Sequence, residues 1–153
     1  VTNPLPFTRS RRRGMVDELR IVEGLVSRVE GAVMAERRIE KLDVWQRAIG
    51  FCDDIYRITH RFPSNERFGL TNQLRRAAVS IPANIAEGSG RMSDRDNLRF
   101  VEIAYGSLME VVSHIEVSFR QEYLNQDQRD ELRQTAERLS RMLSGLRKHL
   151  QSS

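Results

Sequence analysis

The sequence contains a single cysteine, Cys52, among its 153 residues. One thiol cannot form an intrachain disulfide and does not supply the thiolates of a structural zinc site, so we expect a reducing, cytoplasmic location. No apolar run approaches the roughly 20 residues that a membrane span needs, and the basic N-terminus lacks the apolar core of a signal peptide. The sequence therefore predicts a soluble protein with no membrane partner.

Glycine, proline and aromatic residues are also scarce. There are 9 glycines and 4 prolines, and aromatic residues make up 7% of the chain. This content disfavours a sandwich or barrel of short strands linked by turns. The hydrophobic share of 39% is enough for a packed core beside 30% charged residues. We therefore predict an all-α protein with one main domain.

Lysine is nearly absent from the basic residues. Only Lys41 and Lys148 are lysines among 25 basic residues, so 25 − 2 = 23 are arginines. The planar guanidinium group suits bidentate contacts with carboxylate or phosphate. The basic residues face 21 acidic ones, for a net charge of +4. This composition fits a nucleic-acid-binding surface, and it fits equally well an arginine-rich codon usage.

Residues 1–38 are expected to be a flexible basic arm, followed by a possible helix. Residues 1–14 contain three consecutive arginines and show no hydrophobic periodicity. Gly24 and Gly31 would each weaken the helix by about 1 kcal/mol, and the sequence does not say what its apolar face meets. Residues 1–33 are either a tag, the result of a misjudged start before Met34, or a true extension of the protein. The apolar residues that step by three and four along the helix are Leu19, Val22, Val26, Val29 and Val33.

Residues 39–150 show a stronger helical pattern, with 151–153 as a tail. Four helices are predicted, beginning near Asp43, before Leu70, at Ser93 and near Asn125, and three of these starts have capping-box spacing. Sustained three-four spacing and short connections predict an up-down antiparallel four-helix bundle. The expected buried faces are Trp45, Ile49, Cys52, Tyr56 and Thr59, then Leu70, Leu74, Ala77, Ile81 and Ile85, then Leu98, Val101, Tyr105, Leu108, Val112, Ile115 and Phe119, and last Leu132, Ala136, Leu139, Leu143, Leu146 and Leu150.

The third of these helices has a second set of apolar residues, which comprises Phe100, Ile103, Val111 and Val117. This set exceeds what three partner helices in one bundle require. A surplus apolar face on a helix predicts self-association of the protein.

Pro82 lies inside the second bundle helix. It removes the hydrogen bond to the Ala78 carbonyl, so we expect a kink there. The side chains of Ser80 and Asn84 are expected to satisfy the freed backbone groups. The bend either steers the helix around its neighbours or shapes an interface or ligand-facing notch. The residues of this candidate motif are Ser80, Pro82, Asn84, Glu87 and Gly88.

Patterns typical of catalysis or metal binding are weak. Glu110 and His114 lie four residues apart, with no second copy of the pair, and we expect them to form a surface or subunit contact. Cys52 lies on an apolar face and is interpreted as a small core residue. Gly88-Ser89-Gly90 is a poor match to a phosphate-binding loop, because no strand precedes it. We therefore predict a non-enzymatic protein with no catalytic residue, metal or cofactor.

Arginine spacing is the remaining candidate for function. Arg91, Arg95 and Arg99 recur every four residues, and Arg75 and Arg76 precede Pro82. These side chains either contact phosphates or pair with nearby carboxylates in exposed ion pairs worth at most about 1 kcal/mol. Phe68 and Phe100 are the aromatic residues placed to stack on bases, and both are expected in the core.

The segment from Phe68 to Gly88, with its core Ser80-Ile81-Pro82-Ala83-Asn84-Ile85-Ala86-Glu87-Gly88, strongly resembles the bacterial four-helix bundle family first described as proteins encoded in intervening sequences of 23S ribosomal RNA genes. Residues 42–48 and 105–110 match the same pattern, and the resemblance covers about residues 39–150. It implies an antiparallel four-helix bundle, commonly a homopentamer. An accessory subunit of diversity-generating retroelements, which binds RNA and a reverse transcriptase, looks like a relative.

Two functional hypotheses follow. The first is a non-enzymatic, oligomeric helical bundle that binds structured RNA or a ribonucleoprotein through Arg75, Arg76, Arg91, Arg95 and Arg99. The second is a structural or scaffolding protein, including a retroelement-accessory-like role, that does not bind nucleic acid. Residues 34–153 carry 19 basic and 17 acidic residues, which departs from the heavily basic surface expected of the retroelement relative.

Overall fold

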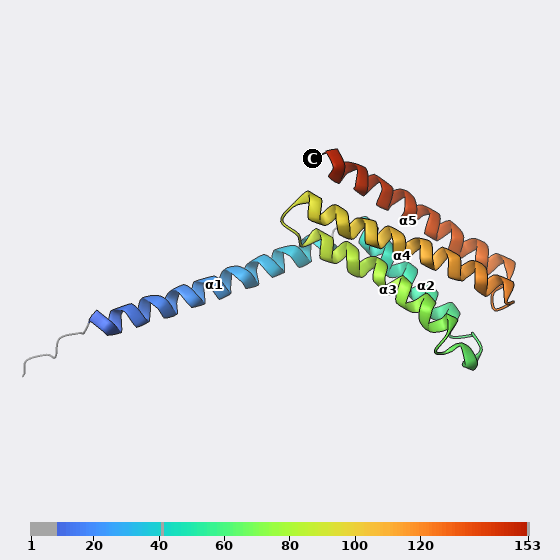
Figure 1. The fold of residues 1–153 in the computed structure, drawn as a ribbon, viewed down its shortest axis with the longest axis horizontal. Coiled ribbons are helices and arrows are strands. Elements are labelled where there is room, and N and C mark those ends of the chain that lie inside the picture. Colours follow the sequence, from blue (N-terminus) through green and yellow to red (C-terminus); the bar gives the residue numbers. More distant parts are fainter. Residues whose placement is uncertain (1–8, 41, 153) are drawn as a thin grey trace, which may run out of the picture. The chain divides into compact units, whose positions relative to one another are not determined.

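The computed structural model describes residues 9–40 and 42–152, and in these two ranges it contains helices and no strand (Figure 1). The prediction of an all-α protein is confirmed. None of the helices in this part of the chain is long and apolar enough to cross a membrane. The elements are α1 (Arg9–Glu40), α2 (Asp43–Thr59), the short 3-10 helix η1 (Ser64–Glu66), α3 (Leu70–Ser89), α4 (Asp94–Arg120) and α5 (Gln126–Ser152).

The chain divides after residue 37 into one unit that contains most of α1 and a second that contains α2–α5. The predicted N-terminal helix is longer than its apolar pattern suggested, because α1 already begins at Arg9. Residues 9–14, expected as part of an irregular arm, are therefore helical, and residues 1–8 of that arm lie outside the described residues. At the other end, α5 extends through residues 151 and 152, which were expected to form a tail.

Helices α2–α5 pack around a common core. Contacts join α2 to α3, α3 to α4, α4 to α5 and α5 back to α2, and consecutive helices run in opposite directions (Figure 1). Burial of apolar surface in this shared core holds the four helices together. The largest side chains that are less than 2% exposed include Phe51 and Ile55 from α2, Leu74 and Ile81 from α3, Leu108 and Ile115 from α4, and Leu139 and Leu143 from α5.

Two of the three helix starts with capping-box spacing have the expected cap. The Ser93 hydroxyl accepts a hydrogen bond from the Asp96 N–H at 3.2 Å and donates one to the Asp96 carboxylate at 2.8 Å. The Gln128 N–H donates to the Asn125 side chain at 2.8 Å, while the Asn125 N–H donates to the Gln128 side chain at 2.9 Å. The Asn125–Gln128 pair is a reciprocal capping box, whereas at Ser93 only the Asp96 N–H is capped. In both cases a side chain satisfies amide groups that have no partner within the helix.

The predicted cap at Asp43 is wrong. Asp43 is the first helical residue of α2, and the cap position is Leu42, which makes no side-chain cap bond. The start of α3 also has a cap that sequence spacing did not indicate. There, a carboxylate oxygen of Glu66, from η1, accepts a hydrogen bond from the Leu70 N–H at 2.8 Å.

The predicted buried face of α2 is confirmed only in part, with Cys52 and Thr59 buried as expected. Ile49 and Tyr56 were expected in the core but are 36% and 46% exposed, and Trp45 is half-buried. The side chains that α2 buries most deeply are Val44, Ala48, Phe51 and Ile55. These residues also step by four, three and four, so the helical period alone does not distinguish between two adjacent apolar stripes.

The second apolar stripe predicted on α4 does not form a continuous surface. Val111 is fully buried in the core, and Phe100 is half-buried. Ile103 and Val117 are exposed, but fourteen residues separate them, or about 21 Å along the helix. The four predicted residues therefore do not form one exposed apolar face on α4.

Pro82 does not interrupt α3, which continues from Leu70 to Ser89 as one α-helix. The Ala78 carbonyl, which loses its usual helical donor to the proline, accepts a hydrogen bond from the Cys52 thiol of α2 at 3.0 Å. The Asn84 side chain donates instead to the Ser80 carbonyl at 2.7 Å. The expectation that Ser80 and Asn84 would replace the missing bond is therefore wrong, because a thiol from another helix supplies the donor.

Candidate nucleic-acid interface

The five arginines predicted to bind RNA do not form one cluster. Gly88 of α3 packs closely against α4, since a Cβ built on it would lie 2.6 Å from the Asn97 side chain. This contact places the first turns of α4, and Arg99 with them, beside the end of α3. Arg76 lies twelve residues before Gly88, which corresponds to about 18 Å along α3. Arg75 and Arg76 are therefore separated from Arg91, Arg95 and Arg99.

Arg75 joins α3 to α2. Its Nε donates a hydrogen bond to the Thr59 hydroxyl at 2.8 Å, and its guanidinium lies 4.7 Å from the centre of the Tyr56 ring. This half-buried side chain therefore already has contacts within the protein. The adjacent Arg76 is exposed and forms no ion pair with the side chains that the structure describes.

The arginines that follow α3 differ from one another. Arg91 pairs with Glu87, and its guanidinium lies 4.6 Å from the centre of the Phe100 ring. Arg95 and Arg99 are exposed and form no ion pair within the described part of the chain. The alternative of carboxylate pairing thus holds for Arg91 and not for these two residues.

Two further cations lie at the same end of the bundle. The Ser140 hydroxyl of α5 lies 3.4 Å from the Tyr105 hydroxyl of α4, which fixes how these antiparallel helices align. Arg99 lies six residues before Tyr105 in α4, and Leu146 lies six residues after Ser140 in α5. The last turns of α5 therefore lie beside the first turns of α4. Figure 1 shows the C-terminal end of α5 on the side of the α3–α4 connection.

Arg147 and Lys148 occupy these last turns of α5, and both are exposed, without an ion pair among the described side chains. We call Arg95, Arg99, Arg147 and Lys148 the basic end. The sequence analysis did not include Arg147 and Lys148 among the candidate residues. The predicted antiparallel order of the helices already places the end of α5 beside the start of α4. Asp94, Asp96 and Glu102 are the nearby acidic residues along α4, so the basic end is mildly positive.

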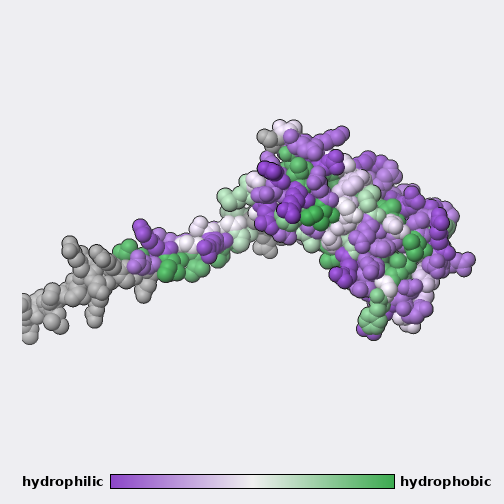
Figure 2. Space-filling model, in the orientation of Figure 1, coloured by the Kyte–Doolittle hydropathy of each residue, from purple (hydrophilic) through white to green (hydrophobic). Residues whose placement is uncertain are grey.

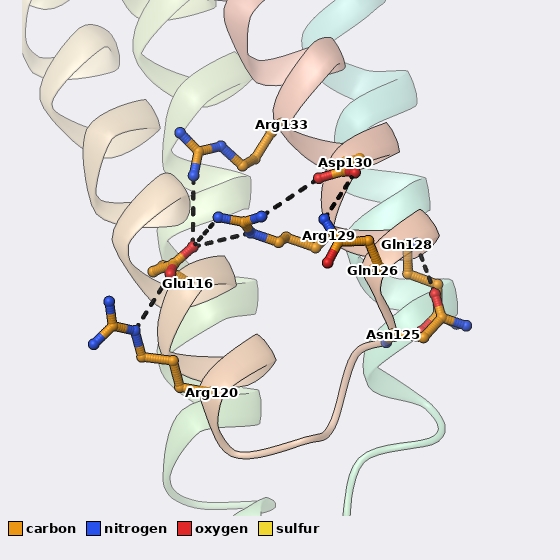
Figure 3. Close-up of polar contacts among 8 residues, drawn as sticks. All are labelled: Glu116, Arg120, Asn125, Gln126, Gln128, Arg129, Asp130 and Arg133. Carbon is orange, nitrogen blue, oxygen red and sulfur yellow. Dashed lines mark hydrogen bonds and ion pairs between the residues drawn. The ribbon is translucent and has the colours of Figure 1, made fainter.

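Three arginines at the opposite end of the bundle, Arg120, Arg129 and Arg133, are engaged with one carboxylate, that of Glu116 (Figure 3). Arg129 of α5 reaches one carboxylate oxygen of Glu116 of α4 with Nε at 3.1 Å and Nη2 at 3.0 Å. Arg133 lies 3.5 Å from the oxygen that Arg129 reaches, and Arg120 lies 3.3 Å from the other oxygen. The hydrogen bond from Arg129 is the main cause that lowers the pKa of Glu116. This cluster ties α4 to α5 and leaves less positive charge for a ligand.

The motif around Pro82 joins α3 to α4. The Ser80 and Ser107 hydroxyl groups lie 2.8 Å apart, and the Asn84 side chain donates to the Ser80 hydroxyl at 3.0 Å. Gly88 leaves room for α4, because an added Cβ would lie 2.9 Å from Cβ of Phe100. Together with the Glu87–Arg91 ion pair, these contacts make the motif a packing surface between two helices of one chain.

Phe68 was expected in the core but is 84% exposed. It lies in the connection between α2 and α3, which is held in place by Glu66: one carboxylate oxygen accepts from Leu70 N–H, and the other accepts from the Tyr123 hydroxyl at 3.1 Å. The Arg67 guanidinium lies 5.4 Å from the centre of the Phe68 ring. The structure thus displays an aromatic side chain at the end of the bundle opposite the basic end.

Potential catalytic and metal-binding groups are scattered. No group of three or more His, Cys, Asp and Glu side chains suited to a metal occurs in the described residues. His114 Nε2 lies 3.5 Å from a Glu110 carboxylate oxygen within α4. Burial, with a smaller contribution from Asp53, raises the pKa of the Cys52 thiol to about 11. A thiol that stays protonated at neutral pH is a poor nucleophile.

The fold and these contacts define the class of protein: an all-α helical bundle with an additional N-terminal helix. Residues 40–145 match the model of the 23S rRNA-intervening sequence protein family, and the chain belongs to that family. Helix α1 lies almost entirely outside the matched residues.

Comparison with solved structures supports the fold. The crystal structure of a protein of unknown function from the S23 ribosomal protein family of Bacteroides thetaiotaomicron is similar, with a TM-score of 0.65 and 23% sequence identity. The similarity covers 69% of this chain and 98% of that one. No curated protein matches the chain.

Proposed function

We propose that this protein is a non-enzymatic, self-associating module, built on an up-down antiparallel four-helix bundle with α1 as an extra helix, that binds structured RNA or a ribonucleoprotein. The basic end carries the contact. The observation behind this proposal is that Arg95, Arg99, Arg147 and Lys148 are exposed together without carboxylate partners, whereas Arg75, Arg91 and Arg129 are engaged within the protein. The family name directs the choice of RNA toward 23S ribosomal RNA.

A basic end with four cations can contact only a few phosphates. Each phosphate contact releases condensed counterions, so affinity falls as the salt concentration rises, with a slope of about −0.7 to −0.9 in log K against log salt per contact. We therefore expect moderate affinity at low salt and a shallow salt dependence. The mixed charge of the remaining surface is consistent with binding at one end rather than along the whole bundle.

Filter binding to 23S ribosomal RNA fragments across a salt series tests the proposal. The variant is Arg95→Gln/Arg99→Gln, and the matched control is Arg57→Gln/Arg141→Gln. The control removes the same charge from two exposed arginines that pair with Asp54 and Glu137. Loss of two phosphate contacts should reduce the slope by about 1.5.

The control should keep the wild-type slope, because its arginines lie outside the basic end. Absence of RNA retention at low salt would contradict RNA binding itself. Equal losses in the variant and the control would contradict its assignment to the basic end.

Phe68 supports a second candidate function, a protein-interaction bundle that does not bind nucleic acid. An exposed aromatic residue beside an arginine, on a connection fixed by Glu66, has the composition of a binding hot spot. A pull-down from nuclease-treated extract should then retain an identified protein with the wild type and lose it with Phe68→Ser. Retention by both proteins would show that Phe68 does not carry the contact.

A further inference from the structure

Helix α1 has an apolar face that is open to solvent. Figure 2 shows hydrophobic residues gathered along one side of this helix. The exposed fractions of these side chains range from 40% to 64%, whereas apolar side chains of this size usually lie inside a folded protein. The residues of this face are Ile21, Val22, Leu25, Val26, Val29 and Val33.

The spacing on this face is that of a coiled coil. Val22, Val26, Val29 and Val33 step by four, three and four, and Leu19 continues the pattern toward the N-terminus. A repeat of seven residues with two apolar positions keeps one narrow seam facing a partner helix along its whole length. We call the residues at positions 19, 22, 26, 29 and 33 the α1 seam.

The two glycines of α1 do not interrupt the α1 seam. Gly24 and Gly31 are seven residues apart and occupy the heptad position on the side of the helix away from the seam. No atom lies within 4 Å of the Cβ that either residue would carry. The two glycines therefore weaken the helix without removing an apolar side chain from the α1 seam.

The structure also indicates which partner fits this seam. The other long seams with the same three-four spacing are covered within α2–α5, where Leu74, Leu108 and Leu139 are fully buried. In α1, the seam residues Val22, Val26, Val29 and Val33 are exposed. A second α1 has the same seven-residue repeat, so that its side chains can fill the spaces between those of the first.

We propose that α1 pairs with α1 of a second copy of this chain through the α1 seam. The pairing rests on the self-association proposed above and assigns it to a specific surface. Isolated helices of this kind are marginally stable in water, and two interior glycines weaken them further. Pairing would therefore hold α1 helical as well as join the two copies.

Mass measurement of the full chain tests this assignment, by size-exclusion chromatography with light scattering over a range of concentrations. The test variant is Val22→Asp/Val29→Asp in the α1 seam. The matched control is Ile103→Asp/Val117→Asp, which places two aspartates at exposed positions of α4. Neither variant alters a core residue of α2–α5, and circular dichroism would verify that the bundle remains helical.

We expect an oligomeric wild type, an α1 variant with at most half the wild-type mass, and a control with the wild-type mass. If the wild type is oligomeric and the α1 variant keeps its mass, the α1 assignment is overturned while self-association stands. A loss of mass in the control alone would place the contact on α4 and also overturn it. A wild type that is monomeric at every concentration overturns both proposals.

Discussion

Helix α1 and the α2–α5 bundle contain the same hydrophobic repeat in opposite environments. In the bundle, residues spaced by three and four are buried against neighbouring helices of the same chain. In α1, the residues with this spacing are exposed. The periodicity of a sequence thus predicts that a seam exists, and the number of helices that surround it decides whether the same chain covers it. Four variant pairs, each matching a bundle residue with an α1 residue, test how far this difference extends.

The largest effect is expected from Leu108→Ala. Leu108 is fully buried, so its truncation should lower the free energy of unfolding by about 2 to 5 kcal/mol. Val26→Ala in α1 should change the unfolding of the bundle by less than about 0.5 kcal/mol, because that side chain is outside the bundle core. Urea denaturation monitored by circular dichroism measures both. A loss below about 0.5 kcal/mol for Leu108→Ala would place the core seam elsewhere.

Gly88→Ala and Gly24→Ala should act in opposite directions. An added Cβ at Gly88 would lie 2.6 Å from the Asn97 side chain and 3.1 Å from its carbonyl oxygen, so α3 and α4 must move apart. Such overpacking costs typically about 1 to 3 kcal/mol. Gly24 has open space around it, and alanine there should favour the helix by about 1 kcal/mol. Thermal unfolding distinguishes these outcomes, and a stabilising Gly88→Ala would contradict the tight α3–α4 contact.

Arg75→Gln should lower bundle stability by about 1 kcal/mol, through loss of the Thr59 hydrogen bond and the Tyr56 ring contact. Arg20→Gln in α1 removes the same charge from an exposed side chain and should have almost no effect on the bundle. Comparing the two urea midpoints measures the difference. Equal midpoints would mean that the Arg75 contacts do not stabilise the protein.

The smallest expected effect is on the reactivity of the Cys52 thiol, whose pKa is raised to about 11 by burial. It should react slowly with a thiol reagent at pH 8 in the native state and rapidly in urea, whereas a cysteine introduced by Val29→Cys on α1 should react rapidly in both. Native Cys52 that reacts as fast as the α1 cysteine would contradict its burial.

The raised pKa of Cys52 also makes the free energy of unfolding depend on pH. An unfolded cysteine ionises near pH 8.5, well below the raised folded pKa of about 11. Ionisation therefore favours the unfolded state, and the contribution of Cys52 to stability, present in full below about pH 8.5, falls as pH rises toward 11. Replacing Cys52 with Ser should remove this component of the pH profile in urea titrations.

Much of the fold was predictable from the sequence because helix periodicity and caps are local properties. The α4 seam from Leu98 to Phe119 and the caps at Ser93 and Asn125 are examples. The buried face of α2 was not predictable in the same way, because two adjacent stripes satisfy one period and only packing against α3 and α5 selects between them. The partners of Phe68, in contrast, depend on a connection whose shape is set by Glu66, far along the chain from Tyr123.

The candidate interface, too, was predictable from the sequence only in part. The spacing of Arg91, Arg95 and Arg99 was visible in the sequence, but which of them are engaged depends on tertiary contacts. Phe100 and Glu87 engage Arg91, and Tyr56 and Thr59 engage Arg75. The contribution of α5 to the basic end required the alignment of α4 with α5, which single-helix patterns do not contain.

The thiol of Cys52 and the ring of Pro82 act on the same Ala78 carbonyl, although thirty residues separate them in the chain. Pro82 removes the usual hydrogen-bond donor, and Cys52 supplies a replacement donor from a different helix. A chain of this fold that lacked the proline would not need a donor on α2 for this carbonyl. A relative that keeps the proline without such a donor must satisfy this carbonyl in another way.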